Sequence, residues 1–351
     1  MIYLGLDVHA TATVWCLIDD KGNTVGRSKT RTAAPELTEL VSRLAGSGEL
    51  LAGQEVGTMS YFVHDVLAAA GVKLLSFNAQ HLRMIASSRK KTDKRDAYWI
   101  AKALQTGMTP HPVYIPLGQV RTLRQLLSQR EAVIRDHKRW LLRAKTSVRS
   151  AGLPVPRRRT VTGIIETLQD DSEGLDEHLA ETLARCQRLH ETLLSERRQL
   201  DATILREAKE IDAVKRLQTI PAVGPWVALT IYASVGDVSR FPDARSLTSY
   251  AGLVPSVWRS GDSERSGGIT KQGTPMLRSM LVQAGHVLLG RCSSASAGPL
   301  KAIATRIHAN RKRRKIAVVA AARHILRIAY YVLRDGTVYD PARLATPKAA
   351  E

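Results

Sequence analysis

Four acidic residues in the first hundred positions have the types and spacing to hold metal ions. Asp7 follows the apolar run 2–6, Glu55 closes the stretch 50–55, and Asp93 and Asp96 lie three residues apart in the basic segment 90–97. Carboxylates are hard oxygen ligands for Mg²⁺. A pair of such ions can hold the oxygens of an in-line phosphoryl displacement. The four acids are therefore predicted metal ligands and catalytic residues of a nucleic-acid-processing enzyme.

A serine followed by glycine, Ser260, is a candidate nucleophile much further along the chain. A serine hydroxyl is a poor nucleophile until a base or a metal removes its proton, and a lone Ser-Gly pair is common in turns. The segment 255–274 is rich in Gly, Ser and Thr and is predicted to be a loop. Its cations could stabilise a pentacovalent phosphate, and they are Arg259, Arg265, Lys271 and, shortly after, Arg278. Other serines of the segment remain possible substitutes for Ser260, namely Ser256, Ser263 and Ser266.

The charge of the chain predicts a polyanionic partner. Its 52 Lys and Arg stand against 32 Asp and Glu, which gives a net charge of +20. Residues 121–159 carry twelve Lys or Arg and only two acids, with leucines interleaved at helical spacing. A solvated helix face usually mixes both signs of charge, so this segment is predicted to follow a phosphate backbone. The predicted nucleic-acid-binding residues in it are Arg121, Arg124, Arg135, Lys138, Arg139, Arg143 and Lys145.

Cysteine usage and hydropathy exclude other classes of protein. The three cysteines, Cys16, Cys186 and Cys292, are widely separated, without the spacing of zinc ligands or of a disulfide framework. The N-terminus has no basic-then-apolar signal pattern, and we find no uncharged apolar run of membrane-spanning length. We therefore expect a soluble protein of the reducing cytoplasm.

The elements expected around the four acids predict an α/β RNase H-like (RuvC-like) domain in residues 1–118. Strands are predicted at 2–8, 12–19, 24–30, 50–52 and 72–77, and helices at 35–45, 60–70, 78–85 and 92–107. In that fold one acid lies on the first strand, one at the fourth strand, and others on a late helix, where an i,i+3 pair shares one face. An actin-like phosphotransferase is disfavoured because His9, Ala10 and Thr11 stand where such enzymes have glycines.

The rest of the chain is predicted to be mostly α-helical. A basic helical region occupies residues 119–213, and its segment 176–211 has near-heptad apolar spacing, which fits a coiled-coil arm or an ordinary bundle helix equally well. A helical C-terminal domain, 214–351, contains the serine segment, with helices predicted at 226–235, 244–251, 275–289 and 312–334. It opens with a Pro-x-x-Gly turn at 221–224 that resembles a helix-hairpin-helix, a turn that can aim backbone N–H groups at a phosphate.

Several segments taken together resemble the IS110 family of insertion-sequence transposases, which are DEDD recombinases related to the Piv invertases. They are residues 5–9, 91–97, 219–221 with Gly224, Phe241, 250–255 and 260–261. The resemblance runs from Asp7 through Arg278 and into the helix that ends at 333–336. One departure is Ala222, which stands where the family often has glycine.

The resemblance implies a RuvC-like domain and a C-terminal transposase domain. It implies that Asp7, Glu55, Asp93 and Asp96 bind Mg²⁺, with Mn²⁺ as a possible substitute, and that Ser260 attacks DNA to form a covalent phosphoserine link. It further implies a structured non-coding bridge RNA that pairs with donor and target DNA. A homodimer or homotetramer is implied as well, in which one subunit's acids complete another's serine site.

The expected function is therefore RNA-guided, Mg²⁺-dependent DNA transposition and recombination. Two alternatives stay open. A RuvC-like structure-specific endonuclease would cut with metal-activated water and leave free ends, and Ser260 would then be only a turn residue. A catalytically silent nucleic-acid-binding protein would keep its function after Asp7→Ala.

Overall fold

The computed structural model describes residues 1–46, 48–85, 93–158, 160–171, 176–260, 263–311 and 313–345. Among the predicted site residues, the side chains of Asp93, Arg259, Ser260 and Arg265 lie outside the described part, as do those of the substitutes Ser263 and Ser266. The chain divides into two units, Met1–Pro116 and Leu117–Glu351, and each is described by itself.

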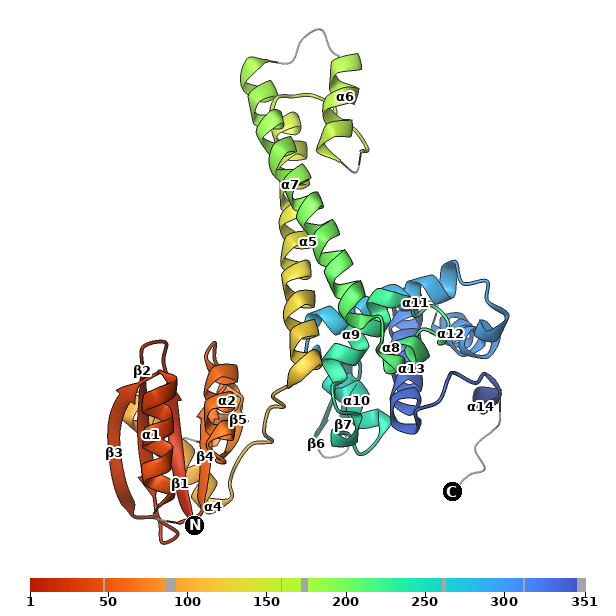
Figure 1. The fold of residues 1–351 in the computed structure, drawn as a ribbon. Coiled ribbons are helices and arrows are strands. Elements are labelled where there is room, and N and C mark those ends of the chain that lie inside the picture. Colours follow the sequence, from red (N-terminus) through yellow and green to blue (C-terminus); the bar gives the residue numbers. More distant parts are fainter. Residues whose placement is uncertain are drawn as a thin grey trace. The chain divides into compact units, whose positions relative to one another are not determined.

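The first unit is an α/β domain built on one mixed five-stranded sheet (Figure 1). The strand order is β3-β2-β1-β4-β5, with β1 parallel to β4, β4 parallel to β5, and the remaining pairs antiparallel. All five predicted strands are present, with bounds β1 (Ile2–Val8), β2 (Ala12–Ile18), β3 (Thr24–Arg31), β4 (Leu50–Glu55) and β5 (Lys73–Phe77). The fourth strand extends three residues beyond its predicted end, so Glu55 is its last residue.

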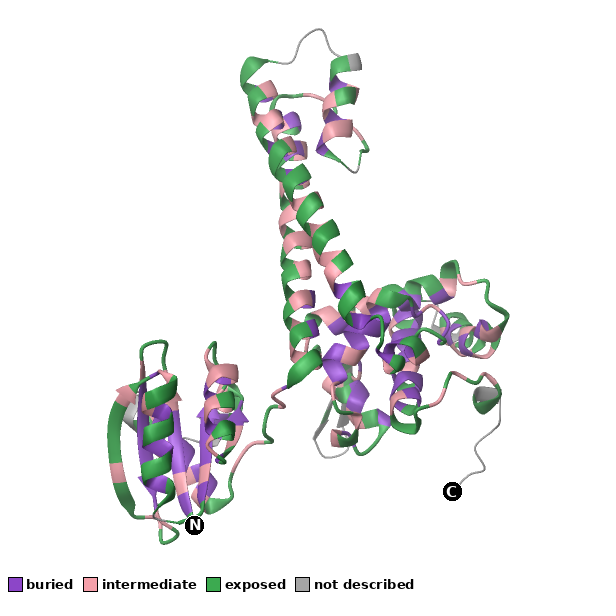
Figure 2. Ribbon diagram, in the orientation of Figure 1, coloured by how far each residue is buried: buried purple, intermediate pink, exposed green. Residues whose placement is uncertain are grey.

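Helices cover both faces of this sheet, and its central strands are buried (Figure 2). The helices are α1 (Ala34–Ala45), α2 (Ser60–Ala69), α3 (Ala79–Ile85) and α4 (Asp93–Thr106). Leu4 and Leu6 of β1 point to the face packed by α1 and α2. The alternate residues Val14, Cys16 and Ile18 of β2 pack against α4 on the opposite face. The period-2 alternation of the strands produces this division, because successive side chains of a strand point to opposite faces.

The second unit begins with a long two-helix arm, formed by α5 (Gly118–Ser150) and α7 (Glu177–Ala208), with α6 (Val161–Asp171) at its tip (Figure 1). Apolar side chains fill the seam at the tip and at the base of the arm. Its middle is polar: Nε of Arg130 lies 2.5 Å from Oδ1 of Asp201, and the His137 ring stacks on that of His190 with centroids 4.0 Å apart. The segment with near-heptad spacing therefore forms an antiparallel arm.

The body of the second unit is helical, as predicted. Its helices are α8 (Asp212–Leu217), α9 (Pro225–Val235), α10 (Ala244–Tyr250), α11 (Pro275–Gly290), α12 (Gly298–Arg311), α13 (Arg314–Asp335) and α14 (Ala342–Ala345), with short 3₁₀ turns η1 (Val238–Arg240) and η2 (Ala295–Ala297). Within the described residues, α13 is the one helix long and apolar enough to cross a membrane by length and composition. The unit buries 61% of that apolar window, as it would a core helix. The helices α6, α8, α12 and α14 were not predicted as separate elements.

The segment 255–274 is not the loop predicted from its composition. It contains an antiparallel hairpin of β6 (Pro255–Ser260) and β7 (Ser263–Ile269), in which Trp258 pairs with Arg265 and Ser260 with Ser263. The loop prediction was therefore wrong, because the Gly and Ser content masked a short run with a β-branched and an aromatic residue, which favours a strand. Residues 261 and 262 lie outside the described part.

Candidate active site and nucleic-acid interface

Asp7 and Glu55 lie next to each other at the carboxyl ends of two neighbouring strands. In the parallel pair of β1 and β4, Leu6 is level with Gln54, and each acid comes one residue later. The side chain of Asp7 is 16% exposed, and Glu55 is also half-buried. Because parallel strands end at the same edge of a sheet, the two predicted ligands are brought together by the register of a buried pair of strands.

Two glycines let α4 approach the sheet closely on the face that carries these acids. A Cβ on Gly5 would overlap the carbonyl oxygen of Ala97, and one on Gly53 would lie 2.9 Å from Cγ2 of Ile100. The side-chain positions of both glycines therefore face α4. Asp7 and Glu55 follow two residues later on their strands, so they share that face.

The direction of α4 brings its first turn toward the same edge. At its C-terminal end, Nε2 of Gln105 donates to the carbonyl of Asp20, in the turn beyond β2. That turn lies at the amino end of β1, because Ile18 pairs with Tyr3. The amino end of α4, which carries Asp93 and Asp96, therefore points toward the carboxyl ends of β1 and β4. Asp96 is half-buried.

A histidine that the sequence analysis did not single out as a site residue stands beside Asp7. Nε2 of His9 lies 3.3 Å from Oδ2 of Asp7. The backbone carbonyl of His9 accepts a 2.8 Å hydrogen bond from Oγ1 of Thr32. This Oγ1 also lies 2.8 Å from Oγ1 of the buried Thr13. The buried threonine pair thus holds His9, the residue that follows β1. The i,i+2 spacing of His9 after Asp7, across the end of the predicted strand, was the available signal.

Among the described side chains, no three His, Cys, Asp or Glu residues form a group that could hold a metal ion. The side chain of Asp93 is outside that set. The described residues thus bring Asp7 and Glu55 to one edge and direct α4 with Asp96 toward it. The role of these acids as metal ligands stays a prediction.

The hairpin with Ser260 is anchored at its root by close backbone packing. Gly252 has φ +66°, and a Cβ there would overlap the carbonyl oxygen of Gln272. Gly273 has φ +71°, and a Cβ there would overlap the carbonyl oxygen of Tyr250. Thr270 N donates to the carbonyl of Val254 at 2.9 Å, just beyond the two strands. The root of the serine hairpin therefore tolerates only glycine at two positions.

Two predicted phosphate-binding cations belong to this root. Nη1 of Arg278 donates to the carbonyls of Gln272 at 2.5 Å and Gly273 at 3.0 Å. Lys271 is exposed, has φ +57°, and donates its backbone N–H to the carbonyl of Gly252. The Arg278 guanidinium is thus engaged in holding the chain next to the hairpin, a role that composition cannot reveal.

All seven predicted basic residues of the arm lie on α5, in different surroundings. Arg124 holds the arm to the body, because Nε and Nη2 donate to the carbonyls of Ala233 and Ser234 at the end of α9. Nη1 of Arg139 lies 2.8 Å from Oδ1 of Asp136. The exposed cations are Arg135, Lys138, Arg139 and Arg143, while Arg121, Arg124 and Lys145 are half-buried. Of the seven, these exposed four are the best placed to meet a phosphate backbone.

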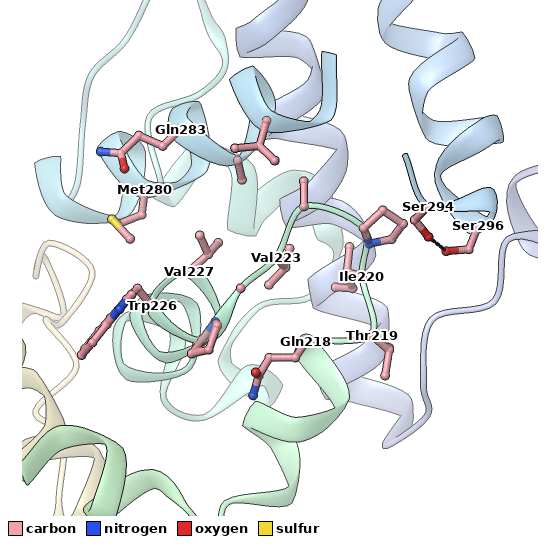
Figure 3. Close-up of a pocket in the computed structure, with 16 residues that line it drawn as sticks. Gln218, Thr219, Ile220, Val223, Trp226, Val227, Met280, Gln283, Ser294 and Ser296 are labelled. Carbon is pink, nitrogen blue, oxygen red and sulfur yellow. Dashed lines mark hydrogen bonds between the residues drawn. The ribbon is translucent and has the colours of Figure 1, made fainter. Parts of the chain in front are cut away.

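The Pro-x-x-Gly turn borders a pocket of about 570 Å³ (Figure 3). The turn lies between α8 and α9, and its Ala222 has φ +66°, the left-handed region that favours glycine. Trp226 and Val227 of α9, with Met280 and Gln283 of α11, line the same pocket. The position where Ala222 replaces the expected glycine thus adopts a glycine-like conformation.

Two family models match the chain, and both are of transposases. A transposase model matches residues 4–151, which include the acid-bearing strands and all of α5. A model described as "Transposase IS116/IS110/IS902 family" matches residues 214–299, which include the serine hairpin. The class defined by these matches is that of enzymes that move DNA segments.

Curated relatives agree with both models. The pilin gene-inverting protein of Moraxella bovis is 30% identical over 259 residues, covering 72% of this chain and 69% of that protein. The transposase for insertion sequence element IS1328 of Yersinia enterocolitica is 25% identical over 96% of this chain and 98% of its own length. The transposase for IS1111A of Coxiella burnetii is 26% identical over 82% and 77%. The chain belongs to the IS116/IS110/IS902 family of transposases.

Proposed function

We propose that the protein cleaves and rejoins DNA through a covalent link at Ser260, with Mg²⁺ held by Asp7, Glu55, Asp93 and Asp96 on a RNase H-like domain. The strand order β3-β2-β1-β4-β5 with a helix packed across the acidic face supports that fold. The single observation that carries the proposal is the placement of Asp7 and Glu55, side by side at the edge toward which the amino end of α4 points.

The acids suit a hard divalent cation, because all are carboxylates and two of them lie at the carboxyl ends of neighbouring strands, on one face of the sheet. When bound, Mg²⁺ would stabilise negative charge on the phosphate oxygens and lower the pKa of a hydroxyl. Asp7 and Glu55 are held by the strand register, and His9 beside Asp7 can orient its carboxylate. These residues thereby offer a preorganised anionic edge that costs no rearrangement when the cation arrives.

In the proposed reaction, the Oγ of Ser260 loses its proton and forms a bond to phosphorus, while one P–O bond to deoxyribose breaks. The leaving oxygen takes a proton and becomes a free hydroxyl at the end of the cut strand. That hydroxyl later attacks the phosphoserine that links the protein to a different DNA strand, which joins the two strands and restores the serine hydroxyl. One ester bond replaces another at each step, so no nucleotide triphosphate is needed. The exposed cations of α5 would hold nucleic-acid backbones, including a guide RNA that pairs with donor and target DNA.

The test incubates purified protein and its co-purifying RNA with donor DNA, target DNA and Mg²⁺. Wild-type protein is expected to yield protein-linked DNA ends and joined products. Ser260→Ala is expected to abolish both, while Ser263→Ala, its cross-strand neighbour, keeps them. Protein–DNA adducts that persist in Ser260→Ala would show that another residue is the nucleophile.

The alternative of a RuvC-like endonuclease predicts a different pattern. Ser260→Ala would still cut and leave free ends, and only Asp7→Asn would remove cleavage. Treatment of the products with protease separates the two functions, because only protein-linked ends change their mobility.

A further inference from the structure

Trp258 on the serine hairpin is an exposed aromatic side chain two residues before Ser260. All five tryptophans of the chain lie in its described part, and Trp258, at 64% exposure, is the one that is exposed. Trp15 is buried, and Trp226 lies under the guanidinium of Arg130, whose Cζ is 3.7 Å from the ring centroid. The solvent-exposed indole of Trp258, on a two-stranded hairpin, is not part of a hydrophobic core.

The hairpin is built to present that indole as a flat surface. A Cβ on Gly267 would lie 2.8 Å from Cζ3 and 3.2 Å from Cη2 of Trp258, so the ring covers this glycine closely. Ser256 holds the two strands together beside this glycine, because its Oγ donates a 3.0 Å hydrogen bond to the carbonyl of Gly268. A side chain at position 267 would displace the ring. One side of the indole therefore packs on the neighbouring strand, and the ring remains largely open to solvent.

Free cations lie next to the same glycines. A hollow of about 600 Å³ at the base of the hairpin is lined by Gly267 and Gly268, by apolar residues of α13, and by Lys315 and Arg323. None of the described residues that line it is acidic. In the described part of the chain neither Lys315 nor Arg323 has an ion-pair partner. Gly267 belongs to this hollow and is also covered by the Trp258 ring, so the cations and the aromatic ring border the same strand. That combination complements a nucleic-acid strand, which offers phosphates and base faces together.

We propose that the hairpin is a nucleotide-binding site for single-stranded DNA. The indole of Trp258 stacks on an unpaired base next to the phosphate that Ser260 attacks, and Lys315 and Arg323 hold the backbone of that strand. The position relative to the attacked phosphate rests on the proposed function. Trp258 and Ser260 are two residues apart on β6, so the indole is close along the chain to the proposed nucleophile. A DNA strand is favoured over a protein partner because the described lining of the hollow carries two cations and no acid, which suits a polyanion.

The test measures tryptophan emission and affinity of the full-length protein with a fluorescein-labelled 20-nucleotide oligothymidylate. The wild-type emission should be quenched on binding. Trp258→Phe should lose most of the quenching but keep its affinity within about threefold, because a phenyl ring still stacks. Trp258→Ala should lose quenching and weaken binding about tenfold or more. Leu142→Ala, on α5 and 62% exposed, is the matched control and should leave both quenching and affinity unchanged.

An abasic oligomer of equal length separates stacking from charge. The wild type and Trp258→Ala should bind it equally, because no base is present to stack. The double variant Lys315→Gln, Arg323→Gln should weaken binding of both oligomers and reduce the dependence of affinity on salt.

Equal affinity of Trp258→Ala and the wild type for oligothymidylate would overturn the proposal. A change of oligomeric state in Trp258→Ala without a change in DNA affinity would overturn it too, since the indole would then bind a second copy of the chain. Preference for oligouridylate over oligothymidylate would assign the surface to RNA and count against it. Ser260→Ala should quench like the wild type, so a failed adduct test with intact quenching removes only the nucleophile assignment.

Discussion

The acid-bearing sheet and the serine hairpin are supported in different ways. Asp7 and Glu55 lie at the carboxyl ends of two inner strands of a five-stranded sheet that has helices on both faces. Ser260 ends one strand of a two-stranded hairpin that is anchored at its root by Gly252 and Gly273. The proposed metal ligands need fixed mutual positions, and a packed core supplies them. The proposed nucleophile must reach a large polymer, and a two-stranded hairpin outside the sheet leaves room for that.

The largest expected effect is on stability, and it distinguishes the packed sheet from the hairpin. Gly5→Ala forces a methyl group into the backbone of α4, so it should lower the free energy of unfolding by about 3 kcal/mol or more. Gly268→Ala on the hairpin has open space around its Cβ and should change that free energy by less than about 0.5 kcal/mol. Urea unfolding followed by circular dichroism measures both. Equal effects would mean that the sheet is no more tightly packed than the ribbon.

Acid should weaken the second unit through His324, next to the Arg323 of the hairpin hollow. Burial, followed by the charges of Arg327, Arg323 and Arg306, lowers the pKa of His324 to about 4 from 6.5. The folded state therefore favours neutral His324, and its stabilisation is complete above pH 6.5 and lost as the pH falls toward 4. At pH 5 the expected loss is about 2 kcal/mol.

The measurement is thermal unfolding of wild type and His324→Gln between pH 7.5 and pH 5. The variant should lose less stability over this range than the wild type. Parallel curves for the two proteins would show that His324 is protonated equally in both states.

Arg278 distinguishes support of the hairpin root from phosphate binding. Arg278→Met removes the donor to the carbonyls of Gln272 and Gly273, so stability should fall by about 1.5 kcal/mol. Affinity for a phosphate backbone, measured by fluorescence anisotropy at several salt concentrations, should change little. A large loss of affinity for the phosphate backbone with unchanged stability would instead show that Arg278 binds phosphate, as the sequence predicts.

The smallest expected effect is a gain. Ala222 has φ +66°, a conformation that costs a residue with a Cβ more than it costs glycine. Ala222→Gly should therefore stabilise the protein by about 0.5 kcal/mol and raise the midpoint of urea unfolding. The gain is smaller than the relieved strain, because glycine also has more conformational freedom in the unfolded chain. A loss of stability would show that the turn has another conformation.

Periodicity predicted the sheet well because buried strands alternate and their neighbours carry turn residues. It placed Asp7 on its strand, and it placed Glu55 beyond a strand that in fact includes it. The hairpin was missed because two short strands with many glycines resemble a loop in composition. The engagement of Arg124 and Arg278 with carbonyl groups depends on contacts with residues distant in sequence or on loop geometry, which charge patterns do not encode. His9 was passed over because its contact with Asp7 depends on the conformation of the strand end.

The account rests on acids of the first unit and the serine of the second acting in one reaction. The most direct measurement is peptide mapping by mass spectrometry of the protein–DNA adduct formed by the wild type and by Asp7→Asn, each with Mg²⁺ and the co-purifying RNA. The account predicts a phosphodiester link on Ser260 in the wild type and no adduct in Asp7→Asn. A link on another residue, or an undiminished adduct in Asp7→Asn, would contradict it.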